Sequence, residues 1–73
     1  MDKYRLTDHA RKRMAEREIS MRDVELALEN PDIIQPSFDQ RKIFAKFIRN
    51  KRLEVVTVSK ENEIIIVTVY YAD

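Results

Sequence analysis

Apolar residues recur at helical spacing in the first part of the chain and at alternate positions in the second. The pattern predicts a first helix that is capped by Thr7 and runs to about Glu18. A second helix is expected to begin after Ser20 and to end at Asn30, because Pro31 disfavours helical backbone in the residue before it.

The rest of the chain is rich in Ile, Val, Phe, Thr and Tyr, which favour strands. The predicted strands are a short edge strand at Ile33–Pro36, then Arg41–Arg49, Leu53–Lys60 and Glu63–Tyr71. The breaks between the last three are too short for a crossover helix, so these strands should be antiparallel. We therefore expect one α+β domain over residues 1–73, with two N-terminal helices packed on one face of a three- to four-stranded antiparallel β-sheet.

The amino-acid composition excludes several kinds of functional site. The 73 residues include no cysteine and one histidine, which excludes disulfides and thiolate sites and argues against a bound metal or other cofactor. The net charge of +1 does not by itself indicate a nucleic-acid-binding protein. With no signal-peptide pattern and no apolar run of about 20 residues, we expect a soluble cytoplasmic protein that does not enter a membrane.

Glycine is absent from the sequence. Backbone positions that need positive φ must therefore be filled by other residues, and asparagine tolerates that region best after glycine. We expect these positions to be Asn30, Asn50 and Asn62.

A line of polar residues follows the edge of the apolar stripe on the first helix. Counted at about 100° per residue, the stripe consists of Leu6, Ala10 and Met14. Arg17 falls inside this stripe, Arg13 at its border and His9 outside it. Two guanidinium groups one turn apart could grip a phosphate, and the imidazole could transfer a proton. The alternative is an ordinary exposed face, in which Arg13 pairs with Glu16 and the arginine stems lie on apolar surface.

The last strand supplies a second candidate surface. The face predicted to meet the helices carries Ile65, Val67, Val69 and Tyr71. The opposite face is predicted to carry Thr68 and Tyr70 beside Lys42, Phe44, Lys46 and Ile48. Cations interleaved with aromatic rings suit RNA, because phosphates need positive charge and exposed bases stack on rings. The alternative is a homodimer formed through Phe44, Ile48 and Ile64.

The segment Leu6–Arg17, with its His-Ala-Arg-x-Arg-Met run from His9, resembles the family numbered 4258 among the domains of unknown function. Ile19–Ser20, Asp23–Glu25 and Asn30–Pro31 extend the resemblance, and Glu18 departs from it because the family commonly has glycine there. The family is similar in layout to the RelE and ParE toxin superfamily, whose members place helices before an antiparallel sheet and often cut RNA without a metal, although ParE-type members act on other targets.

The resemblance implies a ribonuclease-like or toxin-like scaffold. Our leading hypothesis is a RelE-like protein that binds RNA, as a toxin or as a ribonuclease that cleaves it by metal-independent transesterification. In this site His9 would transfer the proton, and Arg13 and Arg17 would stabilise the phosphate. Tyr70 would be a further catalytic residue, contributed by the last strand. Lys42 and Lys46, with the two arginines, would bind RNA.

The sequence is consistent with two other functions. The first is a non-catalytic module that binds an antitoxin-like protein partner or dimerises. The second, sequence-specific DNA binding by the two helices, is disfavoured because the second helix carries Asp23, Glu25 and Glu29 against a single cation, Arg22.

Overall fold

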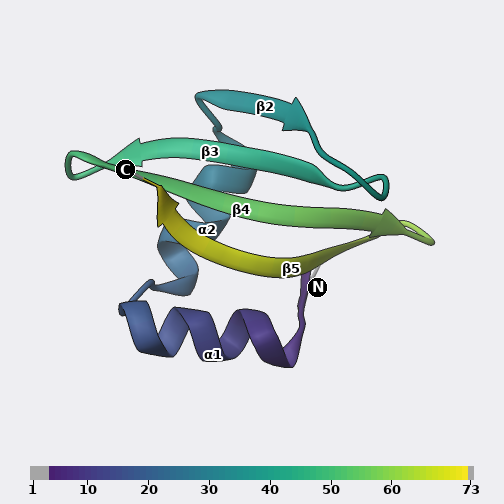
Figure 1. The fold of residues 1–73 in the computed structure, drawn as a ribbon, viewed down its shortest axis with the longest axis horizontal. Coiled ribbons are helices and arrows are strands. Elements are labelled where there is room, and N and C mark those ends of the chain that lie inside the picture. The colour runs from purple at the N-terminus through teal and green to yellow at the C-terminus, as the bar shows by residue number, and fades with distance from the viewer. Residues whose placement is uncertain (1–3, 73) are drawn as a thin grey trace.

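The computed structural model describes residues 4–72 and contains two helices and one five-stranded sheet (Figure 1). The elements in chain order are β1 (Tyr4–Leu6), α1 (Asp8–Arg17), α2 (Met21–Glu29), β2 (Ile33–Pro36), β3 (Lys42–Ile48), β4 (Lys51–Lys60) and β5 (Glu63–Ala72). The α+β class is confirmed. Neither helix in this part of the chain is long and apolar enough to cross a membrane.

The helix ends follow the sequence prediction. The Thr7 hydroxyl accepts a hydrogen bond from the backbone N–H of Ala10, and the Ser20 hydroxyl accepts one from that of Asp23. Each hydroxyl satisfies an amide that has no partner inside its helix. Asn30 is the C-cap residue of α2, as expected from the proline that follows it.

The sheet differs from the prediction. Its strand order is β1-β5-β4-β3-β2, and β1 runs parallel to β5 while the other neighbours are antiparallel. The predicted three- to four-stranded antiparallel sheet is therefore wrong. The β1 strand has only three residues, too few to show the alternation of apolar and polar residues by which a strand is recognised in a sequence. Its partners, Ile64–Ile66, lie near the other end of the sequence.

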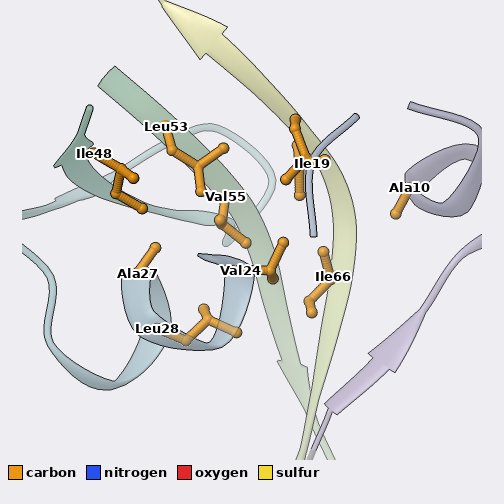
Figure 2. Close-up of a cluster of buried hydrophobic side chains, with 10 residues drawn as sticks. Ala10, Ile19, Val24, Ala27, Leu28, Ile48, Leu53, Val55 and Ile66 are labelled. Atoms are coloured by element: carbon orange, nitrogen blue, oxygen red, sulfur yellow. The ribbon is translucent and has the colours of Figure 1, made fainter. Parts of the chain in front are cut away.

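Both helices pack on one face of the sheet, α1 against β1 and β5 and α2 against β3 and β4. The buried cluster between them consists of Ala10, Ile19, Val24, Ala27, Leu28, Ile48, Leu53, Val55, Ile66 and Val69. Figure 2 shows Val24 and Leu28 of α2 directed toward the sheet near Val55 and Ile66. Burial of these apolar side chains is the main stabilising contribution.

A bulge changes which residues of β5 face the helices. Val56 pairs with Thr68 but Thr57 pairs with Ile66, so Val67 has no partner on β4. An extra residue reverses the alternation beyond it. Val69 contributes to the core as predicted. Beyond the bulge, Ile66 belongs to the buried cluster, whereas Ile65 and Val67, which were predicted to face the helices, do not.

None of the elements within residues 4–72 covers the other side of the sheet. We call this side the open face; from β3, β4 and β5 it carries Ile43, Ala45, Phe47, Arg52, Glu54, Val56, Thr68 and Tyr70. Thr68 and Tyr70 lie on this face as predicted. The residues predicted from β3 were wrong by one position, because Ile48 is buried in the core and Phe44 packs against it. Lys42 and Lys46 share the helix-side face with them.

Candidate functional site

The polar line on α1 lies on the surface of the protein. His9 and Arg17 are exposed and Arg13 is half-buried. Ala10 is the one fully buried residue of α1, so the covered stripe is narrower than expected and leaves Arg17 outside it. The Nη1 atom of Arg13 lies 3.2 Å from Oε1 of Glu16, which is the ordinary ion pair of the alternative interpretation.

The two predicted strand lysines are also separated from the rest of the proposed site. The Nζ atom of Lys46 lies 3.7 Å from Oδ1 of Asp32, and its side chain is largely buried. The other carboxylate oxygen of Asp32 accepts a hydrogen bond from the backbone N–H of Phe47. Lys42 is exposed at the start of β3.

Tyr70 lies on the opposite side of the sheet from these residues. Val69 and Tyr71, the residues before and after it in β5, point toward the helices. Because side chains alternate along a strand, Tyr70 points to the open face. The sheet therefore separates Tyr70 from His9 on α1. The structure does not bring together the four residues predicted to be catalytic.

The open face contains a polar group of its own around Tyr70, which we call the Glu54 cluster. It consists of Phe47, Arg52, Glu54 and Tyr70. The cross-strand register dictates this arrangement, because Glu54 pairs with Tyr70 and Arg52 pairs with Phe47. Residues two apart on β4, such as Arg52 and Glu54, also share a face.

Glu54 is the centre of this cluster and is only 8% exposed. The Tyr70 hydroxyl donates a hydrogen bond of 2.7 Å to its Oε1 atom, and Nε of Arg52 lies 2.7 Å from its Oε2 atom. The Arg52 contact is close but is not aligned as a hydrogen bond, which leaves this buried Nε without a hydrogen-bond partner. An ionised carboxylate in this position is stabilised by one aligned donor and one adjacent cation.

The outer part of the cluster is accessible. The Arg52 guanidinium lies 5.9 Å from the centre of the Phe47 ring, within range of a cation–π contact. Phe47 is 57% exposed, so a second planar group has room to stack on it.

The cluster changes the acid–base behaviour of Tyr70. Burial, the hydrogen bond to the Glu54 carboxylate and the negative charge of Glu54 together raise the pKa of the Tyr70 hydroxyl to about 12, and burial is the largest of these causes. The positive charge of Arg52 opposes this rise in the pKa. Tyr70 therefore remains a protonated donor well above neutral pH.

The sequence interpretation missed Arg52 and Glu54, although it contains a signal for them. Two charged residues occupy alternate positions beside the apolar residues Leu53 and Val55, in the strand with the strongest β pattern. A central strand seldom keeps a buried carboxylate without partners. The identity of those partners depends on the cross-strand register, which requires the structure.

Residues 4–72 contain no group of three His, Asp or Glu side chains placed to hold a metal ion. Comparison with protein families matches residues 6–71 to the model described as Domain of unknown function (DUF4258). Comparison with curated proteins and with solved structures gives no match.

Proposed function

Since the chain belongs to the family of domains of unknown function DUF4258, whose description assigns no activity, we propose from its chemistry that it binds single-stranded RNA on the open face and cleaves it without a metal. The exposed Phe47 ring beside the Arg52 guanidinium is the observation that carries the binding proposal. This is the activity expected from the resemblance to RelE-type toxins, with the binding surface moved from α1 to the sheet.

Each outer residue of the Glu54 cluster suits one part of an RNA chain. An unpaired base can stack on the free side of Phe47, which is the usual way proteins hold single-stranded bases. The Arg52 guanidinium can donate to a phosphate oxygen of the same nucleotide. The α1 surface has cations but no Phe, Tyr or Trp, and its one aromatic side chain is the smaller imidazole ring of His9.

Fluorescence anisotropy with a short labelled single-stranded RNA tests this surface. We expect Phe47→Ala to weaken binding about tenfold, because stacking of one base contributes about 1–3 kcal/mol. Phe38→Ala is the matched control: Phe38 is also exposed and also lies beside an arginine, Arg41, but sits in the β2–β3 turn. Equal losses in both variants, or RNA binding unaffected by Phe47→Ala, would refute the open-face assignment.

The second candidate is a non-catalytic module that uses the same face to bind a protein partner or a second copy of the chain. It is favoured by the apolar residues around the cluster, including Ile43 and Val56, beside the exposed Phe47. The predicted dimer contacts Phe44 and Ile48 cannot serve it, because both pack on the helix side. Light scattering distinguishes the two functions: a stable dimer that Phe47→Asp converts to monomers, without RNA binding, would favour the module.

A further inference from the structure

Glu54 is a buried carboxylate on a face that no described helix or loop covers, which is an unusual place for a purely structural charge. Its two oxygens contact different groups, Tyr70 through Oε1 and Arg52 through Oε2. The contact with Arg52 is not aligned as a hydrogen bond, and Nε of Arg52 is buried without a hydrogen-bond partner. A buried donor without an aligned partner is unfavourable, and Arg52 would gain aligned hydrogen bonds if its guanidinium turned outward to a bound phosphate.

We infer that Glu54 and Tyr70 are the general base and the general acid of RNA transesterification, with Arg52 on the phosphate. This inference rests on the proposed function, since the bound nucleotide must lie on the open face. It replaces His9, which is exposed on the other side of the sheet, as the residue that transfers protons.

The three groups can divide the reaction between them. When the Arg52 guanidinium turns to the phosphate, Oε2 of Glu54 becomes free to accept the proton of the ribose 2′-hydroxyl. The 2′-oxygen then bonds to phosphorus and the bond from phosphorus to the 5′-oxygen breaks. The Tyr70 hydroxyl gives its proton to that 5′-oxygen, and Arg52 stabilises the charge that develops on the phosphorane. The products are a 2′,3′-cyclic phosphate and a free 5′-hydroxyl.

The hydrogen bond between Glu54 and Tyr70 also explains how the site returns to its starting state. After cleavage the carboxyl group carries the extra proton and the tyrosine is a phenolate. The two oxygens are 2.7 Å apart, so the proton can pass directly from the carboxyl group to the phenolate. No histidine, metal or second substrate is needed to close this cycle.

The test uses the full chain and a DNA strand that contains a single ribonucleotide, with the all-DNA strand as control. Wild-type protein in the presence of EDTA should cleave at the ribonucleotide alone and leave a 2′,3′-cyclic phosphate. Glu54→Gln and Tyr70→Phe should each slow cleavage about 100-fold or more, the usual contribution of one acid or base. RNA affinity should stay within about twofold of wild type, and His9→Ala should leave the cleavage rate unchanged.

A sulfur-bridged substrate distinguishes catalysis from a structural role. When sulfur replaces the bridging 5′-oxygen, the leaving group departs without a proton. This substrate should restore cleavage by Tyr70→Phe but not by Glu54→Gln. Equal rescue of both variants, or of neither, would overturn the assignment.

The two proposals fail in different ways. Wild-type protein that binds RNA through Phe47 but leaves the ribonucleotide intact would refute the catalytic pair and keep the binding function. Wild-type protein that does not bind RNA would refute both.

Discussion

Glu18 ends α1 in the left-handed region, with a φ of 54° and a ψ of 45°. Its backbone N–H bonds back to the last carbonyl groups of the helix, as in a C-terminal cap that normally uses glycine. A side chain with a Cβ atom in this region costs about 1–2 kcal/mol. The sequence has no glycine to avoid this cost, so the strain at the helix end is retained.

Glu18→Gly should therefore raise the free energy of unfolding by about 1 kcal/mol, since glycine adopts this backbone conformation freely. Denaturant unfolding followed by circular dichroism measures the change. Ala15→Gly is the control, because Ala15 is exposed within α1 and glycine there should lower stability by about 1 kcal/mol. A loss of stability in both variants would show that Glu18 is not strained.

Tyr70 gives a prediction about pH. Burial and the contact with Glu54 raise the pKa of Tyr70 from 10.0 to about 12, so the folded state holds the proton more tightly than the unfolded chain. The tighter binding of this proton adds to the free energy of unfolding. The contribution is fully present below pH 10 and is lost as the pH rises toward 12. Tyr70→Phe should lose less stability than wild type across this window.

Ultraviolet difference titration measures the pKa of Tyr70 directly. In Glu54→Gln the pKa of Tyr70 should fall toward 10.0 without reaching it, because the carboxylate is removed while the burial remains. An unchanged pKa in that variant would mean that burial alone accounts for the shift.

The residues with positive φ show how far the backbone conformation could be predicted from the lack of glycine. Asn50 and Asn62 have φ values of 66°, as predicted from the lack of glycine. The prediction for Asn30 is wrong, because its φ is −140°. Arg49 and Glu61 precede the two asparagines with positive φ as well, so each tight turn uses two residues in this region. Composition indicated the residue type, but not that the turns require consecutive positions.

At the scale of elements, Thr7 joins α1 to β5 as well as capping the helix. Its hydroxyl accepts from the Ala10 N–H and donates a hydrogen bond of 2.8 Å to the carbonyl oxygen of Val67, the bulged residue. Its own N–H donates to the carbonyl oxygen of Ile66. The bulge thus offers carbonyl groups at the point where β1 turns into α1.

Thr7→Ala should lower the free energy of unfolding by about 2 kcal/mol, because it removes a helix cap and leaves the Val67 carbonyl without its hydroxyl partner. Thr7→Ser keeps the hydroxyl and should retain most of the stability. Thermal unfolding of the two variants provides the comparison. If both lose the same stability, the methyl group and not the hydroxyl holds this junction.

The sequence predicted the helices better than the sheet, because the ends of the helices are set by nearby residues and the sheet pairing is set by distant ones. Helix ends depend on local chemistry, such as the caps at Thr7 and Ser20 and the proline after Asn30. The β1–β5 pairing and the bulge at Val67 depend on contacts between the two ends of the chain. The cross-strand register that sets which residues of β3 share a face with Tyr70 also depends on such contacts, so the prediction placed Lys46 beside Tyr70, although they lie on opposite faces.

At the scale of the whole molecule, charge is divided between the two helices. The surface of α1 carries four cations, Arg11, Lys12, Arg13 and Arg17. The α2 helix carries mainly acids, Asp23, Glu25 and Glu29. Both helices lie on the side away from the open face, so the cations of α1 cannot contact a nucleotide held by the Glu54 cluster. The salt dependence of binding then depends on which face the RNA occupies.

Binding of single-stranded RNA loses affinity with salt at a logarithmic slope of about −0.7 for each phosphate neutralised. RNA on the open face meets Arg52 and few other cations, which gives an expected slope of about −1. RNA on α1 would meet four cations and give a slope of about −3. Arg52→Gln should make the slope shallower by about 0.7, while the double variant Arg11→Gln/Lys12→Gln should leave it unchanged. The reverse pattern would place RNA on α1, return the proposed site to His9 and Arg13, and leave the Glu54 cluster as a structural feature of the sheet.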